Sequence, residues 1–97
     1  MSPSGAGEIA VRHNVEAHRF EAEVDGRMSV ADYVLEDRRI VFTHTFVPSE
    51  LRGRGVAEKL VRAGLAFAQT EGRRVVPQCS YVEAFIRRHP EFQTLVD

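Results

Sequence analysis

The chain has 97 residues, 43% of them hydrophobic and 28% charged, and its formal net charge is -1. This length fits one domain, and the composition is typical of a folded globular protein and not of a disordered one. A charge so close to zero favours neither nucleic-acid binding nor attachment to a membrane surface, so we expect neither partner.

The cysteine content and the first residues bear on the compartment. The one cysteine, Cys79, cannot form an internal disulfide, and no cysteine cluster suggests a metal site. Residues 1–8 lack the apolar core of a signal peptide, and no stretch approaches the roughly 18 apolar residues of a membrane span. We therefore expect a cytoplasmic protein with a flexible tail over residues 1–8 and one domain over residues 9–97.

The first half of the chain predicts strands joined by tight turns. Ile9–Asn14 is a short candidate strand. Arg19–Val24 alternates apolar with polar residues, and the Asp25-Gly26 pair that follows is favoured in tight hairpins. Met28–Leu35 would be the returning strand, and Arg39–Val47 is rich in the β-branched and aromatic residues that favour strands. The last three strands predict an antiparallel meander.

The second half predicts two helices separated by a short strand. A helix should begin near Arg54 or Gly55 and end before Gly72, because its apolar residues recur at helical spacing. Arg73–Pro77 would be a buried strand, and Ser80 with Glu83 matches a capping box that opens a second helix. The order is β-β-β-α-β-α on a mixed sheet, an α/β fold whose last two strands form a parallel pair.

The junction before the first helix carries the most specific signal. Arg52-Gly53-Arg54-Gly55 places two permissive residues and two fixed positive charges against a helix N-terminus, whose free N–H groups and dipole favour a phosphate. From residue 52 to residue 74 there are six Lys and Arg against two Glu. A plain surface turn is the alternative reading. The patterns GxxxxGK[ST] and GxGxxG are both absent, so nucleotide hydrolysis and dinucleotide redox chemistry have no support.

The same residues resemble a known family. The run "RGRGVA" over residues 52–57 fits the R/Q-x-x-G-x-G/A signature of the GCN5-related N-acetyltransferases, and it likewise lies between a strand and a helix. The resemblance implies that acetyl-CoA, or coenzyme A, is the cofactor and that its pyrophosphate is held by the loop. It also implies that the strand before the loop diverges from its parallel neighbour to admit the pantetheine. The cofactor-binding residues would be Phe46, Val47, Arg52, Gly53, Arg54, Gly55, Val56 and Ala57.

The short length points to one branch of the family, and it also separates this chain from the larger members. "THTFVPSELRGRGVAEKLV" and "VVPQCSYVEAFIRRHPEF" resemble the small single-domain YjdJ-type branch of the family. Larger members have one or two extra helices after the first strand, where this chain has the Asp25-Gly26 turn, so the acceptor side should be open. The aromatic pair that supplies a general acid in the last helix corresponds to Phe85-Ile86 here, so the usual tyrosine is missing.

Two residues are candidates for the chemistry. Cys79 follows the last strand directly, and a thiol near a helix N-terminus can have a lowered pKa. It could carry the acetyl group or protonate the leaving thiolate, although a buried cysteine is often only a small hydrophobic residue. His44 lies on the diverging strand and could act as a general base. It alternates with Phe42 and Phe46, so a packing role on the sheet is the alternative.

Three functions therefore remain from the sequence. The leading prediction is an N-acetyltransferase that moves an acetyl group from acetyl-CoA to an unidentified amine, on a small molecule, a lysine or a protein N-terminus. The second is an acyl-CoA-binding module without catalysis, favoured by the open acceptor side and the missing tyrosine. The third is an interaction domain whose loop binds a protein or an RNA phosphate. The length is compatible with a monomer or a weak dimer.

Overall fold

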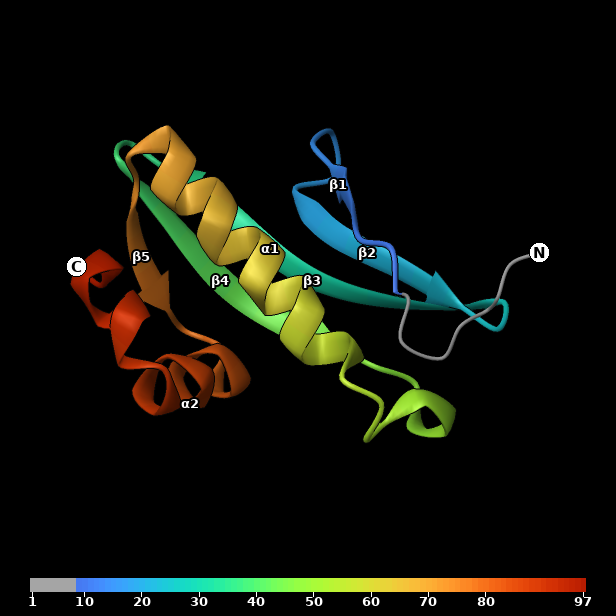
Figure 1. Cartoon of the computed structure of the whole chain (residues 1–97). Coiled ribbons are helices and arrows are strands. Elements are labelled where there is room, and N and C mark those ends of the chain that lie inside the picture. The colour runs from blue at the N-terminus through green and yellow to red at the C-terminus, as the bar shows by residue number, and fades with distance from the viewer. Residues whose placement is uncertain (1–8) are drawn as a thin grey trace.

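The structure is a computed structural model that describes residues 9–97, and the tail predicted over residues 1–8 lies outside the described residues. One five-stranded sheet carries the α-helices and two short 3-10 helices (Figure 1). In chain order the elements are β1 (Arg12–Asn14), β2 (Arg19–Val24), β3 (Arg27–Glu36), β4 (Arg39–Phe46), η1 (Ser49–Leu51), α1 (Val56–Glu71), β5 (Arg74–Pro77), α2 (Ser80–Arg88) and η2 (Pro90–Leu95).

The sheet is mixed, as the sequence predicts. Its spatial order follows the chain from β1 to β5, with antiparallel pairing from β1 through β4. β5 pairs with β4 in parallel, and α1 provides the crossover between them (Figure 1). The first strand is shorter than predicted, and β3 is longer by one residue at each end. The predicted α/β architecture is confirmed.

The β2–β3 hairpin has the tight turn that its sequence predicts. Asp25 and Gly26 both have positive φ, 53° and 74°, and the flanking residues Val24 and Arg27 are paired across the ladder. A second hairpin joins β3 to β4 at the opposite end of α1 (Figure 1), where Asp37 also has a positive φ of 44°. The first of these hairpins therefore lies near the start of α1 and the second near its end.

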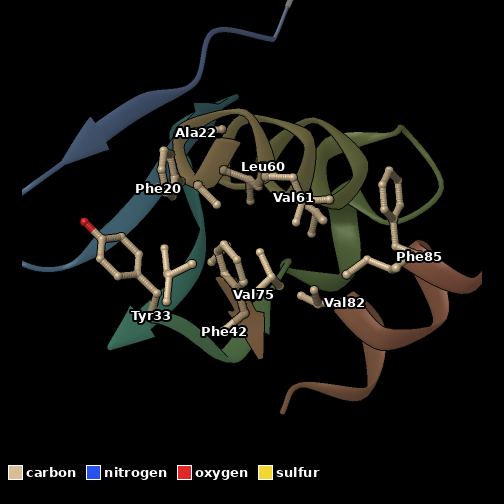
Figure 2. Close-up of a cluster of buried hydrophobic side chains, with 14 of the residues drawn as sticks. Phe20, Ala22, Tyr33, Phe42, Leu60, Val61, Val75, Val82 and Phe85 are labelled. Carbon is tan, nitrogen blue, oxygen red and sulfur yellow. The ribbon is translucent and has the colours of Figure 1, made fainter. Parts of the chain in front are cut away.

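Both helices pack on the same hydrophobic cluster. Phe20, Phe42 and Val75 contribute from three strands, and Leu60 and Phe85 contribute from α1 and α2 (Figure 2). All five are 3% exposed or less, and burial of a side chain of this size contributes roughly 1.5–3 kcal/mol. The helical stripe predicted for the first helix is the stripe that is buried, and it fixes α1 across the sheet.

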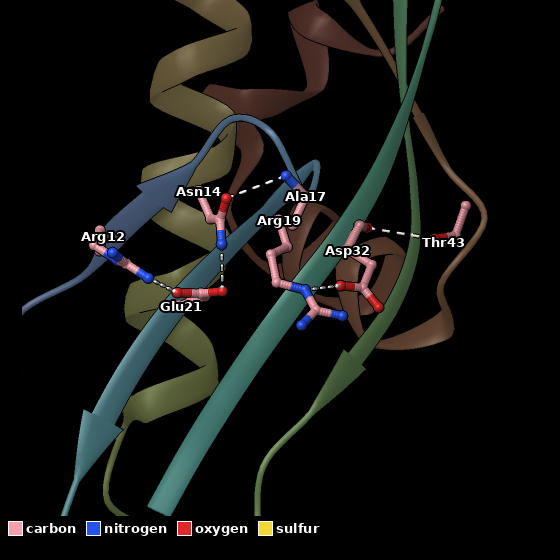
Figure 3. A network of polar contacts seen from close by, with 7 residues as sticks. All are labelled: Arg12, Asn14, Ala17, Arg19, Glu21, Asp32 and Thr43. Carbon is pink, nitrogen blue, oxygen red and sulfur yellow. Dashed lines mark hydrogen bonds and ion pairs between the residues drawn. The ribbon is translucent and has the colours of Figure 1, made fainter.

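The opposite face of the sheet is more exposed. Met28, Val34 and Phe46 are between 42% and 48% exposed there, and cross-strand pairing places His44 on the same face, opposite Asp32. We call this face the open face. Its polar contacts link β1, β2 and β3: Figure 3 shows Glu21 held by Arg12 and Asn14, and Asp32 held by Arg19.

An irregularity in β4 changes which side chains face the core. Asp32 pairs with His44 but the next residue, Tyr33, pairs with Phe42, so Thr43 is an extra residue in β4. The Thr43 hydroxyl donates a 3.4 Å hydrogen bond to the carbonyl oxygen of Asp32 (Figure 3). Beyond such a bulge the alternation of faces restarts one residue out of phase. Thr45 therefore faces the helices, while its neighbour His44 faces away from them.

Three of the four helix ends have the features that the sequence predicts. Gly55 and Gly72 flank α1 with φ of 82° and 68°, the left-handed conformation that glycine adopts without strain. His89 and Pro90 end α2 where predicted. The predicted capping box at Ser80 and Glu83 is wrong, because Cys79 is the cap residue, with an extended backbone. Glu83 instead forms an ion pair with Arg87 at 3.2 Å.

Within residues 9–97 no helix combines the length and the apolar character that crossing a lipid bilayer requires.

Candidate functional site: a cleft at the start of α1

A pocket of about 610 Å³ lies where β4, the loop after η1 and the two helices meet. Its walls come from the end of β4, the loop, the first turn of α1 and the start of α2. The lining residues are Thr45, Val47, Leu51, Arg52, Gly53, Gly55, Val56, Ala57, Glu58 and Tyr81. Pockets of 300–1,000 Å³ are the usual size for cofactor and ligand sites, so this one can hold a sizeable part of a cofactor.

The loop between η1 and α1 forms the polar end of the pocket. Gly53 has a φ of 83°, close to that of Gly55, and a Cβ added to either glycine would have no atom within 4 Å. Glycine favours this backbone conformation, and the space that a side chain would take at either residue is open. No side chain caps the first N–H groups of α1. These N–H groups are free to bind an anion.

Contacts from both sides hold this loop in place. Leu51, in η1, is 1% exposed and anchors the loop in the core. Arg52 Nε donates a 3.1 Å hydrogen bond to the carbonyl oxygen of Val47, which ties the loop to the end of β4. Arg54 Nη1 lies 3.0 Å from Asp25 Oδ2 in the β2–β3 hairpin. These contacts fix the backbone of the loop in the absence of a ligand.

The parallel pair β4–β5 separates next to the pocket. Its register ends at Phe42 and Pro77, and the N–H of Cys79 makes one more bond, of 2.9 Å, to the Phe42 carbonyl. The last four residues of β4 continue without β5 beside them. This separation is the divergence that the family resemblance implies, and the bulge at Thr43 lies where it starts.

The Cys79 thiol sits at the divergence. Its Sγ is 3.6 Å from the Thr45 hydroxyl, and Thr45 lines the pocket. Burial raises the pKa of the thiol, but the N–H groups of Val82 and Tyr81 and the Thr45 hydroxyl outweigh it, so the pKa of Cys79 is lower than usual. Both N–H groups belong to the first turn of α2, so Cys79, at the cap position, faces backbone donors that favour its thiolate form.

Tyr81, in the first turn of α2, is an ionisable residue that lines the pocket. Burial raises its pKa, the nearby Glu58 carboxylate raises it further, and Arg88 acts in the opposite direction. Its hydroxyl therefore keeps its proton at neutral pH and can donate it in a hydrogen bond. Glu58 also lines the pocket, and a 3.1 Å ion pair with Arg62 offsets its negative charge.

The structure brings together most of the residues predicted to bind the cofactor. Six of them line the pocket: Val47, Arg52, Gly53, Gly55, Val56 and Ala57. Arg54 is turned toward Asp25. Phe46 has its side chain on the open face, so only its backbone could contribute. Cys79 contacts a pocket residue, whereas His44 lies on the open face, on the opposite side of the sheet from the pocket.

Four lining residues were not predicted from the sequence. Thr45 was missed because its orientation depends on the bulge at Thr43. Tyr81 follows Cys79 by two residues, so its closeness to the end of the last strand is the signal that could have found it. Leu51 gave a usable signal, since it is a single large apolar residue within the polar run from Pro48 to Gly55. Glu58 gave none, because its place at the pocket depends on how α1 is oriented.

Comparisons with known proteins agree with this geometry. The profile of the family described as "GCN5-related N-acetyl-transferase" matches residues 19–95, most of the chain. Protein NATD1 of Bos taurus is 33% identical over 92 residues, which cover 92% of this chain and 81% of that protein. Protein NATD1 of Homo sapiens is 33% identical over 95 residues, which cover 91% of this chain and 84% of that protein.

A solved structure has the same fold. The solution NMR structure of a GCN5-like protein from Staphylococcus aureus superposes with a TM-score of 0.71, covering 96% of this chain and 90% of that one. The two sequences are 22% identical, so this likeness concerns the fold.

Proposed function

The chain belongs to the GCN5-related N-acetyltransferase family, and we propose that it transfers an acetyl group from acetyl-CoA to an amine. The observation that carries this proposal is the pocket at the uncapped start of α1, with Gly53 and Gly55 at one end and Cys79 beside the other. An anion site and a reactive thiol therefore lie along one cleft. A cofactor with phosphates at one end and a thioester at the other fits both.

The loop residues would hold the phosphate end of acetyl-CoA. Gly53 and Gly55 have no Cβ to obstruct a ligand, and the first N–H groups of α1 supply donors. The helix dipole adds a favourable field at the same point. Arg52, which lines the pocket, adds a fixed positive charge. The loop thus offers a pyrophosphate hydrogen-bond donors, a positive charge and the space to approach.

The residues at the divergence of β4 and β5 would serve the transfer. Acetyl-CoA supplies the thioester, and in the overall reaction the C–S bond breaks, an N–C bond forms and the amine proton ends on the released thiol. Tyr81 keeps its proton because its pKa is raised, so it is the candidate hydrogen-bond donor to the leaving sulfur. Cys79 has the lowered pKa of a nucleophile or a base, and the Thr45 hydroxyl orients it.

His44 would act from the acceptor side. It lies on the open face, whereas the adjacent Thr45 faces the pocket, so the two residues flank β4 at the point where β5 has left it. An amine that approached from the open face would meet His44 before it reached the thioester. We therefore assign His44 to receiving or orienting the acceptor and not to binding the cofactor.

Binding of acetyl-CoA is the first test, measured by isothermal titration. Ala57→Glu is the informative variant, because glutamate suits the first turn of a helix but would place a carboxylate in the pocket. Ala66→Glu is the matched control, since Ala66 is exposed later on the same helix. We expect micromolar binding by the original protein and by the control, and at least about a tenfold loss in Ala57→Glu. No binding by the original protein would overturn the proposal.

A module that binds acyl-CoA without catalysis is the second candidate. The observation in its favour is that the pocket lies on the helix-covered side, while the acceptor would have to use the more exposed open face. Cys79→Ser and Tyr81→Phe separate the two functions. In a transferase, these variants keep acetyl-CoA binding and lose release of free thiol in the presence of an amine. In a binding module, neither variant changes a measured activity.

A further inference from the structure

The tip of the β2–β3 hairpin is linked to the anion-binding loop by two crossed ion pairs. Asp25, in the hairpin turn, lies 3.0 Å from Arg54 in the loop. Arg27, at the start of β3, lies 3.8 Å from Glu50 in η1. Each segment thus offers one acid and one base to the other. The two segments are far apart in sequence, and the hairpin brings them together at the start of α1 (Figure 1).

The two arginines of the loop have different surroundings. Arg52 lines the pocket and is held by the carbonyl of Val47. Arg54 is not part of the lining, and its guanidinium donates to the Asp25 carboxylate at 3.0 Å. Of two fixed positive charges next to the α1 N-terminus, one is therefore available to an anion in the pocket and the other is neutralised by an acid of the chain itself.

This ion pair can be exchanged for a ligand. The side chains of Arg54 and Asp25 are 44% and 67% exposed, and exposed pairs of this kind are weak and screened by salt. A phosphate offers a guanidinium a stronger, charge-assisted contact than an exposed carboxylate does.

We propose that Asp25 sets the affinity of the cleft for its phosphorylated ligand by holding Arg54 away from the pocket until a phosphate takes the place of the carboxylate. Asp25 is thus an internal competitor for Arg54, and release of Arg54 is coupled to binding. The inference rests on the proposed function, because it requires a ligand with phosphates at the start of α1. It assigns the turn that stands in the place of the extra helices of larger relatives a role in that function.

The test compares two Asp→Asn variants. Asp25→Asn removes the charge, and asparagine tolerates the positive φ of the turn, so the hairpin keeps its shape. Asp37→Asn is the matched control: it makes the same change at a positive φ, in the hairpin at the other end of α1. Titration with coenzyme A should show a dissociation constant about threefold lower for Asp25→Asn than for the original protein and the control. The gain should shrink in high salt.

A double variant tests whether Arg54 carries the effect. In an Arg54→Gln background, adding Asp25→Asn should give no further gain, because there is no guanidinium left to release. A gain of equal size in that background would show general charge repulsion instead and would overturn the proposal. Titration with 3′-dephospho-coenzyme A then tells which phosphate takes Arg54: the gain is lost if it is the 3′-phosphate and kept if it is the pyrophosphate.

The outcomes separate this inference from the function on which it rests. If the original protein binds coenzyme A and Asp25→Asn binds no more tightly, the inference fails and the proposed function stands. If neither protein binds coenzyme A at millimolar concentration, both fail. Equal thermal unfolding midpoints of the variants, within about 2 °C, confirm that the differences arise at the site and not from loss of the fold.

Discussion

The two halves of β4 have opposite properties although they form one strand. From Arg39 to Phe42 the strand is paired on both sides, and three of its four residues are buried. From Thr43 to Phe46 it is paired with β3 alone, and exposed residues alternate with half-buried ones. The first half holds the sheet to the helices, whereas the second half borders the pocket and the Cys79 thiol.

The boundary between the halves is sharp because two features coincide. The parallel ladder with β5 ends at Phe42, and the extra residue of the bulge is the next one, Thr43. A strand that loses its neighbour has backbone groups free on that side, which a ligand can use. We infer that one half of β4 serves stability and the other half serves binding, so changes in the two halves should affect different measurements.

Phe42→Ala should have the largest effect on stability. The ring is 1% exposed and lies in the centre of the hydrophobic cluster, and removing a buried phenylalanine costs about 3–5 kcal/mol of unfolding free energy. Urea denaturation followed by circular dichroism would measure the loss. A loss below about 1 kcal/mol would contradict the division of β4, because the paired half would then not be the structural half.

Gly64→Ala should have the next largest effect, and its sign is diagnostic. Alanine in an exposed helix interior is favoured over glycine by about 1 kcal/mol. Here a Cβ would lie 2.7 Å from one ring carbon of Phe42 and 2.9 Å from another, so we expect a net loss of about 1–3 kcal/mol. Unfolding of the double variant Gly64→Ala/Phe42→Leu checks the cause, because the smaller side chain should recover part of the loss.

The regular parts of this fold could be predicted from sequence because local signals and burial agree. Asp25-Gly26, the apolar stripe of α1 and Gly72 each correspond to the predicted feature. The capping box at Ser80 failed because the chain stays extended through Cys79, whose N–H is bonded to Phe42. A contact with a residue far away in sequence, and not the local pattern, fixes the start of that helix.

The candidate site was predicted in part, and the bulge explains the rest. The glycines and arginines of the loop carry a local signal, so the polar end of the pocket follows from sequence. The other end does not, because strict alternation would put Phe42, His44 and Phe46 on one face. The extra residue Thr43 reverses this for the last two, and it turns Thr45 toward the pocket in their place. A single inserted residue leaves no compositional trace.

The titration of Cys79 tests the second half of β4 and the start of α2. Its expected effect is smaller than the two losses of stability above. Because its pKa is lowered in the folded protein, alkylation by iodoacetamide should have a midpoint pH below that of an unperturbed thiol. Thr45→Val removes a hydroxyl contact and should move the midpoint up. A midpoint at or above that of a free cysteine in the unfolded chain would mean that burial dominates.

The same shift has a consequence for stability, with a defined sign. A group whose pKa is depressed on folding stabilises the protein above its unfolded pKa, and this contribution is lost as pH falls through the folded pKa. The difference in unfolding free energy between the original protein and Cys79→Ser should therefore widen as pH rises from 7 to 10. A difference that narrows over that range would show that the thiolate is disfavoured in the fold.

His44→Ala should change stability least and is the sharpest test of the division of β4. The side chain is exposed on the open face, and substitutions at such positions usually stay within about 0.5 kcal/mol. Because the pocket lies on the other side of the sheet, binding of acetyl-CoA should also be unchanged. Turnover with an amine should fall. If His44 orients the acceptor, the Michaelis constant for the amine should rise. If His44 takes the proton, the turnover number should fall instead. A loss of acetyl-CoA affinity would instead place His44 with the cofactor and remove the distinction between the two sides of β4.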